Sequence, residues 1–413
     1  MIRPLLQYGI TMAFKISPII DSENLNSRYL EQVQKFIWDF PNDLDPTDLP
    51  DYKEIYILAL KFVMGFQHSK DTIRVAVTEM EKFLQWVYRE NGKSPKIYDP
   101  IAIMDYFNFI KKPPVHWCSE NNVRKFITVN GERIANPKWR PFKKLENARN
   151  VNSAISKAYS YVNGFFEYLV DCDYVSRNPC ARIKRSKLVS TGVDRVYSMM
   201  VFTDKERAIL FETIDEMAAN DSRLLRERFI FYIMIHHYLR ESDLAEYMER
   251  VPLMGDIQLD STGFWVFSIH GKGNKKRRIA LNEEVLCTLR EYRNYHGLSD
   301  KPEPSEQTPL LLARGGIEPV KTTRQIRRLI SKVFELTALR AERLVIDKTV
   351  ISKFRNAHCH WLRHSGISHD LNVRKRAIGF VRDDAGHSSV ATTSMYLDGD
   401  EIERFVSGVD TKD

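Results

Sequence analysis

Apolar residues recur at helical spacing in three segments of the first half of the chain. The first segment has Asp71 as a suitable N-cap and Asn91-Gly92 as its stop, and a second helix is expected after Asp99-Pro100. The pattern predicts a first domain that is entirely helical. The positions that define the three apolar faces are Ile73, Val77, Met80, Leu84 and Val87, then Ile103, Phe107 and Ile110, and finally Val151, Ile155, Tyr159, Val162, Phe166 and Leu169.

The segments on either side of these helices have a different composition. Residues 1–60 mix proline, aspartate and aromatic side chains, as in FPNDLDPTDLPDY, and we expect an N-terminal extension with one short helix. After the third helix, Asn178-Pro179 interrupts the pattern and the basic run RIKRSK follows, which is typical of an exposed linker. We therefore expect a helical domain over residues 61–186 and a second domain over residues 187–413.

The second half mixes helices with short strands. Thr203 and Glu206 have the spacing of a capping box at the start of an amphipathic helix. The runs GFWVFSIH and RRIAL alternate as strands around GKGNKK and predict a β-hairpin with a longer turn, and helices dominate from Glu283 onward. The predicted fold class is mainly α, with a small antiparallel β-sheet in the C-terminal domain.

Composition indicates the cellular compartment and the class of binding partner. The 413 residues include 62 Lys and Arg against 54 Asp and Glu, and the net charge of +8 favours a polyanionic partner. The five cysteines are scattered without a CxxC pair, which favours a reducing cytoplasm over a disulfide framework or zinc module. The first twenty residues lack the pattern of a secretory signal, and no uncharged apolar run reaches the length of a membrane span, so no membrane association is expected.

Four places in the second half hold residues suited to one phosphate. Arg240, three residues before Asp243 in YLRESDLAEY, offers a rigid fork for two phosphate oxygens, although a surface ion pair is the commoner explanation for this spacing alone. Lys272 stands between two glycines in a turn that does not have P-loop spacing and could equally be a solvated loop. In HCHWLRHSGISHDL, His360 and Arg363 share a helical face.

The histidine-rich stretch also raises a metal site as an alternative. It lacks the HExxH arrangement and an obvious carboxylate partner, so we expect no metal and assign its histidines other than His360 to the core or surface. The fourth place is GHSSVATTSMY, in which Tyr396 follows His387 by nine residues. A phenol titrates near pH ~10, so a tyrosine nucleophile needs neighbours that stabilise negative charge.

The sequence resembles the tyrosine recombinase (phage integrase) family, which includes the Xer and Cre recombinases. The resemblance rests on the order Arg, Lys, His-x-x-Arg, His, Tyr, found here in LRESDL, GKGNKKR, HWLRHSGISH and GHSSVATTSMY. The resemblance covers residues 200–400 and extends more loosely over 70–186, which look like the family's core-binding domain. Two positions depart from the family pattern: Tyr238 stands where relatives have glycine, and a charged run, Arg382 to Asp384, precedes Ala385 where relatives tend to be apolar.

The resemblance implies an enzyme that breaks and rejoins DNA at specific sites through a 3′-phosphotyrosyl bond on Tyr396, in integration or excision of a mobile element. Arg240 and Arg363 would clamp the phosphate with help from His387, Asp243 would orient Arg240, His360 would act on the tyrosine proton and Lys272 would protonate the leaving 5′-oxygen. No cofactor is implied. A type IB topoisomerase and a catalytically silent DNA-binding regulator remain alternatives.

The partners implied are double-stranded DNA, three further protomers in a homotetramer or heterotetramer, and an accessory DNA-bending or directionality protein, in a bacterial cytoplasm at the nucleoid. Both domains would form a C-shaped clamp that touches mainly phosphates, and the tail after Tyr396 would dock on a neighbouring protomer. The candidate DNA contacts are Lys138, Arg140, Lys143, Lys144, Arg182, Lys184, Arg185, Lys275, Arg277, Arg324 and Arg327.

Overall fold

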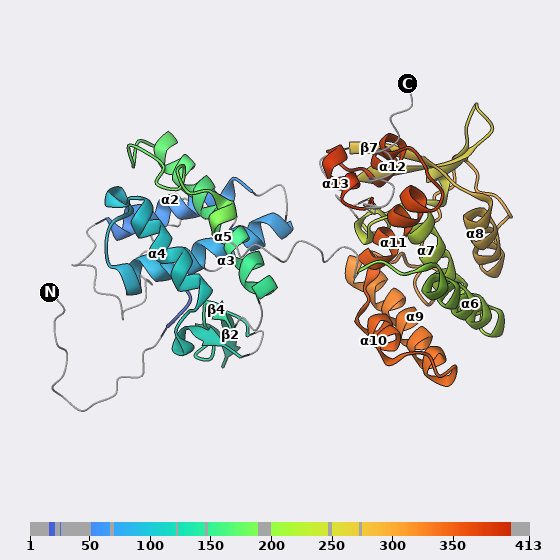
Figure 1. Cartoon of the computed structure of the whole chain (residues 1–413), viewed down its shortest axis with the longest axis horizontal. Helices are drawn as coiled ribbons and strands as arrows, with labels where there is room; N and C mark the ends of the chain where they lie inside the picture. Colours follow the sequence, from blue (N-terminus) through green and yellow to red (C-terminus); the bar gives the residue numbers. More distant parts are fainter. Residues whose placement is uncertain are drawn as a thin grey trace, which may run out of the picture. The chain divides into compact units, whose positions relative to one another are not determined.

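The chain divides into two compact units, Met1–Val193 and Asp194–Asp413 (Figure 1). The coordinates form a computed structural model. Among the helices that it describes, none combines the length and the apolar character needed to cross a bilayer. The structure describes residues 16–20, 25, 51–66, 70–120, 123–144, 148–188, 200–246, 250–271 and 275–397.

In the part of the first unit that the structure describes, the helices α2 (Tyr52–Met64), α3 (Lys70–Trp86), α4 (Pro100–Lys111) and α5 (Ala148–Asp171) pack around an aromatic core. Asp99 caps α4, since its side chain accepts the Ala102 N–H at 2.9 Å. The predicted helices over these segments are confirmed, although α3 begins just before Asp71 and continues as one π-helical stretch, Val87–Asn91, up to Gly92. Phe83 lies at the centre, with its ring against Trp86, Tyr106, Phe165 and Phe166.

Helix α2 starts inside residues 1–60, where we expected an extension with one short helix, and its apolar side is buried in the core together with Ile16, Ile19 and Ile20. The expectation of an entirely helical unit is wrong. Between α4 and α5 lie a parallel pair, β1 (Cys118–Ser119) with β4 (Phe142–Lys143), and an antiparallel hairpin, β2 (Phe126–Val129) with β3 (Glu132–Ala135). Strands this short and exposed leave little apolar alternation to read.

In the second unit the apolar helix α7 (Leu225–His236) packs against α6 (Asp204–Asn220), α8 (Glu283–Tyr295) and α9 (Thr323–Arg343), and α10 (Lys348–Asn356) packs on α9. The Thr203–Glu206 capping box is present at the start of α6, and the predicted hairpin is confirmed as β6 (Trp265–Gly271) paired with β7 (Lys275–Ala280). A short strand, β5 (Ile257–Leu259), adds to the other side of β6, which gives the small antiparallel sheet expected.

Within the described residues, this unit continues with α11 (Cys359–Asn372), α12 (Ile378–Ala385) and α13 (Val390–Ser394). A small separate core in this part contains Tyr238, Ile367, Val381, Ala385 and Tyr396. Gly366 lets α11 approach α7 closely, because a Cβ at this position would lie 1.9 Å from the Ile235 carbonyl oxygen. The end of α7 and the middle of α11 are therefore pressed together where the candidate phosphate-binding residues lie.

Candidate active site

Arg240 is held by the segment that follows α7. Its backbone N–H donates to Oδ2 of Asp243 at 2.7 Å, and Arg277 Nη2 on β7 donates to the same oxygen at 2.6 Å. Asp243 thus contacts Arg240 through the backbone, whereas we had expected it to hold the guanidinium. Arg277, expected on the DNA-contact surface, instead forms an ion pair whose carboxylate side chain is only 4% exposed.

The two arginines of the candidate set meet at the end of α12. Arg363 Nη2 donates to the Ala385 carbonyl at 2.6 Å, and Arg240 Nη2 donates to the next carbonyl, that of Gly386, at 3.4 Å. The other terminal nitrogen of Arg363, Nη1, donates to the Tyr238 carbonyl. Two consecutive carbonyls therefore bring together guanidiniums from residues more than a hundred positions apart in the sequence.

The Tyr238 side chain anchors the backbone segment that binds Arg363. Its φ of +54° is unusual for a residue with a Cβ. Its hydroxyl donates to Asp370 and accepts from Arg376 Nη1 at 2.9 Å, while Arg376 Nη2 reaches Asp384 at 2.8 Å. This network fixes the backbone whose carbonyl holds Arg363.

The site carries concentrated positive charge. Burial, and then repulsion from Arg240 and Arg277, lowers the pKa of Arg363 to about 9, so it stays protonated at pH 7. Burial and the same three arginines lower the pKa of His387 to about 4, which leaves its imidazole neutral. A phosphate bound here would relieve the repulsion among the three guanidiniums, so the electrostatics favour an anion.

Tyr396 lies among the histidines, and its side chain is buried. Nδ1 of His364 is 2.5 Å from the phenol oxygen, and the His387 ring stacks almost parallel to the phenol at 6.2 Å between centroids. Nδ1 of His387 is 2.9 Å from the hydroxyl of Thr393 on α13, and the Tyr396 carbonyl accepts the Asn372 side-chain amide at 2.8 Å. These contacts place the phenol beside the two arginine-bearing segments.

His360 is turned to a different partner. Its Nδ1 is 3.2 Å from Oε2 of Glu241, whose other oxygen accepts Arg327 Nε at 3.0 Å. Burial opposes ionisation of Glu241, but the His360 and Arg327 contacts and a backbone hydrogen bond outweigh it and lower its pKa to about 2. The His360 and His364 rings are 6.0 Å apart, so both line the same side of the site.

Of the six candidate catalytic residues, the structure brings five to one region: Arg240, His360, Arg363, His387 and Tyr396. Lys272 lies outside the described residues. Three further residues at the site, His364, Glu241 and Tyr238, were not among the predicted catalytic residues. The i, i+4 spacing of His360 and His364 on one helix was a usable signal for the first of these, whereas the other two depend on tertiary contacts.

The candidate DNA contacts fall into three groups. Arg140 is half-buried and donates to the carbonyls of His116, Pro137 and Trp139, and Arg277 is ion-paired as described above. Arg327 is also ion-paired, but its side chain is 55% exposed. The side chain of Lys275 is not among those described. The remaining seven are exposed: Lys138, Lys143, Lys144, Arg182, Lys184, Arg185 and Arg324.

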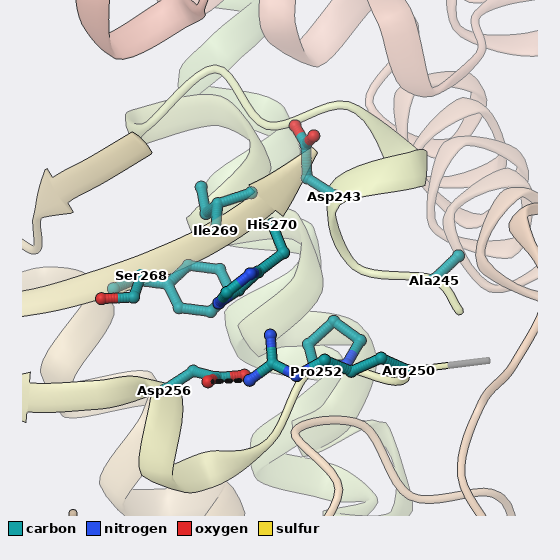
Figure 2. Close-up of a pocket in the computed structure, with 9 residues that line it drawn as sticks. Asp243, Ala245, Arg250, Pro252, Asp256, Ser268, Ile269 and His270 are labelled. Atoms are coloured by element: carbon teal, nitrogen blue, oxygen red, sulfur yellow. Dashed lines mark hydrogen bonds and ion pairs between the residues drawn. The ribbon is translucent and has the colours of Figure 1, made fainter. Parts of the chain in front are cut away.

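A small hollow adjoins Asp243 on its other side. Figure 2 shows Asp243 at one end, Ser268 and His270 of β6 along it, and the Arg250–Asp256 ion pair, 2.5 Å between nitrogen and oxygen, across it. Its volume of about 20 Å³ accommodates a water molecule but not a nucleotide. Within the described residues, no three His, Cys, Asp or Glu side chains gather as metal ligands would.

Known proteins share this sequence pattern. The model of the phage integrase family matches residues 201–402. A tyrosine recombinase of Thermosipho africanus is 25% identical over 300 residues, which cover 69% of this chain and 89% of the relative. Tyrosine recombinase XerC of Chlorobaculum parvum is 23% identical over 337 residues, which cover 77% of this chain and 89% of the relative.

Solved structures share the fold. XerH site-specific recombinase bound to a palindromic difH substrate in a post-cleavage complex gives a TM-score of 0.55 at 15% identity, with 95% of this chain and 98% of that one covered. The Tn1549 transposon integrase in complex with circular intermediate DNA gives 0.52 at 13% identity, with 86% and 99% covered. Residues 201–402 thus form a domain of the phage integrase family, and the curated relatives of the chain are tyrosine recombinases.

Proposed function

We propose that this protein carries out site-specific DNA recombination, with Tyr396 as the nucleophile that breaks and rejoins the DNA backbone. One observation carries the proposal: the phenol, in contact with His364 and His387, lies beside a positively charged region in which Arg240 and Arg363 are held on consecutive carbonyls. A phenol beside a prepared anion site suits attack on a phosphodiester, because the negative charge grows on the phosphate oxygens in the transition state.

In the proposed reaction, the Tyr396 phenol oxygen attacks the phosphorus, the bond to the 5′-oxygen breaks, and a 3′-phosphotyrosyl link forms. Arg240 and Arg363 hold the non-bridging oxygens, and His387 contributes a hydrogen bond from its neutral ring. Lys272 protonates the leaving 5′-oxygen. The covalent link keeps the energy of the phosphodiester, so the 5′-hydroxyl of a partner strand can rejoin it without a cofactor.

The wider assembly is also a proposal. The XerH and Tn1549 integrase structures contain DNA, which supports double-stranded DNA with defined recombination sites as the partner of this chain. We propose a tetramer on two such sites, with residues 61–186 as the core-binding domain and the tail after Tyr396 docked on a neighbour. An accessory DNA-bending or directionality protein, action at a bacterial nucleoid, and integration or excision of a mobile element complete the proposal.

The seven remaining exposed basic residues, together with Arg327, are proposed as contacts to the DNA backbone. Lys143 and Lys144 follow one another at the end of the β1–β4 pair, and Arg182, Lys184 and Arg185 follow α5. When exposed lysines and arginines bind phosphates, counterions are released from the DNA, which favours binding. Such contacts therefore give affinity without recognising the base sequence.

The test first identifies the DNA sequence that the protein recognises. The Tyr396→Phe protein selects bound duplexes from a random library, and the enriched sequence is rebuilt as a nicked suicide duplex. The wild type should then form a covalent adduct that survives denaturing electrophoresis, whereas Tyr396→Phe should bind equally well and form none. Adduct formation by Tyr396→Phe would overturn the assignment of the nucleophile, and relaxation of plasmids that lack the site would favour a topoisomerase.

A further inference from the structure

Two residues of one helix hold the nucleophile. His364 and Asn372 are eight positions apart on α11 and so share a helical face. Nδ1 of His364 lies 2.5 Å from the phenol oxygen of Tyr396, with the two rings 5.4 Å apart, and the side-chain amide of Asn372 donates to the Tyr396 carbonyl. One helix thus fixes both the side chain and the backbone of Tyr396.

His360, the histidine first expected to act on the phenol, is engaged elsewhere. Its Nδ1 faces Glu241, which is itself held by Arg327 from α9. The side chain of His360 is also 46% exposed, at the outer edge of the group, whereas His364 is the ring in hydrogen-bond contact with the phenol. The geometry therefore assigns the two histidines different tasks.

We propose that His364 is a catalytic residue, which orients the Tyr396 phenol and receives its proton during attack. The proposal rests on the proposed function, since it concerns the same phosphoryl transfer. As the phenol oxygen–phosphorus bond forms and the bond from phosphorus to the 5′-oxygen breaks, the phenol proton passes to Nδ1 of His364. When the strand is rejoined, the 5′-hydroxyl gives its proton to Lys272 and attacks phosphorus, the bond to the phenol oxygen breaks, and Nδ1 returns its proton to the phenol.

The surroundings leave His364 able to accept that proton. Burial, followed by the neighbouring positive charges, lowers its pKa to about 4, so at pH 7 the ring is neutral and Nδ1 can accept the phenol hydrogen bond. A phosphate between Arg240 and Arg363 adds negative charge beside the ring, which stabilises the imidazolium formed during attack. The titratable groups that act on His364 are His360, Arg363, His358 and His387.

The experiment distinguishes deprotonation of the nucleophile from protonation of the leaving group. The probe is the selected duplex with a sulfur in place of the bridging 5′-oxygen at the scissile phosphate, because a thiolate leaves without being protonated. The rate of adduct formation is measured from pH 6 to about 9.5 for wild type, His364→Ala, His364→Asn and Lys272→Ala. His369→Ala is the matched control, since His369 lies on the same helix but faces Asp204 at 3.1 Å.

On ordinary DNA we expect both His364→Ala and Lys272→Ala to lose about 10²–10⁴-fold in rate. The sulfur substrate should restore Lys272→Ala but not His364→Ala, whose rate should instead rise about tenfold per pH unit towards the phenol pKa of ~10. His364→Asn keeps an acceptor near the position of Nδ1 but takes no proton, so it should bind DNA normally and cleave slowly.

Two results would overturn the assignment: wild-type rates for His364→Asn, or rescue of His364→Ala by the sulfur substrate. A wild type that forms no adduct with either substrate would instead overturn the proposed function, and this inference with it. Equal binding of all variants in mobility-shift assays, with His369→Ala at the wild-type rate, would show that a loss comes from chemistry and not from folding.

Discussion

The closest approach of α7 and α11 offers a direct test of how the arginines are positioned. Gly366 lies in the middle of α11, and a Cβ there would meet the Ile235 carbonyl oxygen at 1.9 Å and the Tyr238 ring at 3.0 Å. The first of these is a backbone atom inside a buried helix, which cannot rotate away as a side chain can. The change from 1.9 Å to the 3.4 Å of an ordinary contact requires about 1.5 Å of separation between the helices.

The Gly366→Ala variant should therefore be destabilised by about 3 kcal/mol, at the upper end of the usual cost of overpacking a core. For a unit of this size the melting temperature should fall by about 6–12 °C. The same separation should disturb Arg363 and Arg240, because the Tyr238 carbonyl and the segment after α7 hold them. Adduct formation should then decrease more than DNA binding.

The assay is a urea titration of the full chain, read by hydrogen exchange of peptides from α11, so that the second unit is observed separately. The control is Gly379→Ala in α12, where no heavy atom lies within 4 Å of the added Cβ. That variant should gain about 0.5–1 kcal/mol, because alanine restricts the unfolded chain and favours the helix. If Gly366→Ala unfolds within about 0.5 kcal/mol of wild type, the close-packing argument is refuted.

Three further predictions concern other parts of the structure. Tyr238→Phe should cost about 1–3 kcal/mol, measured by the same titration, because buried Asp370 loses a hydrogen-bond donor; no change would mean that the network does not stabilise the site. Stability should fall between pH ~6.5 and 4, because the pKa values of His364 and His387 are about 4 in the folded protein and the unfolded chain binds more protons in that window; equal urea midpoints at pH 7 and 5 would contradict this. Lys143→Ala should weaken binding to all duplexes alike and reduce the salt dependence by about one ion, as mobility shifts at several salt concentrations would show.

Local signals in the sequence predicted most of the fold. The α4 cap at Asp99, the Thr203–Glu206 box and the β6–β7 hairpin each depend on residues only a few positions apart, and each was predicted. The hairpin of β2 and β3 was missed, because its strands have four residues each and present no buried face.

The candidate site was predictable only in part, because residue types and order are local whereas contacts are not. The sequence motifs led to Arg240, Arg363 and Tyr396, but no pattern along the chain indicates that Asp243 pairs with Arg277, 34 positions away. The assignment of His364 to the core or surface followed the usual behaviour of histidine, and a hydrogen bond to a residue 32 positions later was needed to change it.

The nine-residue interval between His387 and Tyr396 has a structural reason. Gly386, with a φ of +63°, ends α12 in a left-handed turn, and the His387 N–H closes that turn on the Arg382 carbonyl at 3.0 Å. The chain then needs the short helix α13 to reverse direction, and the contact between His387 and Thr393 holds the reversal in place. A shorter interval would leave no room for α13, and the phenol would not reach both the His387 ring and Nδ1 of His364. The spacing therefore follows from the requirement that one turn present two carbonyls to the arginines and return the tyrosine to the same place.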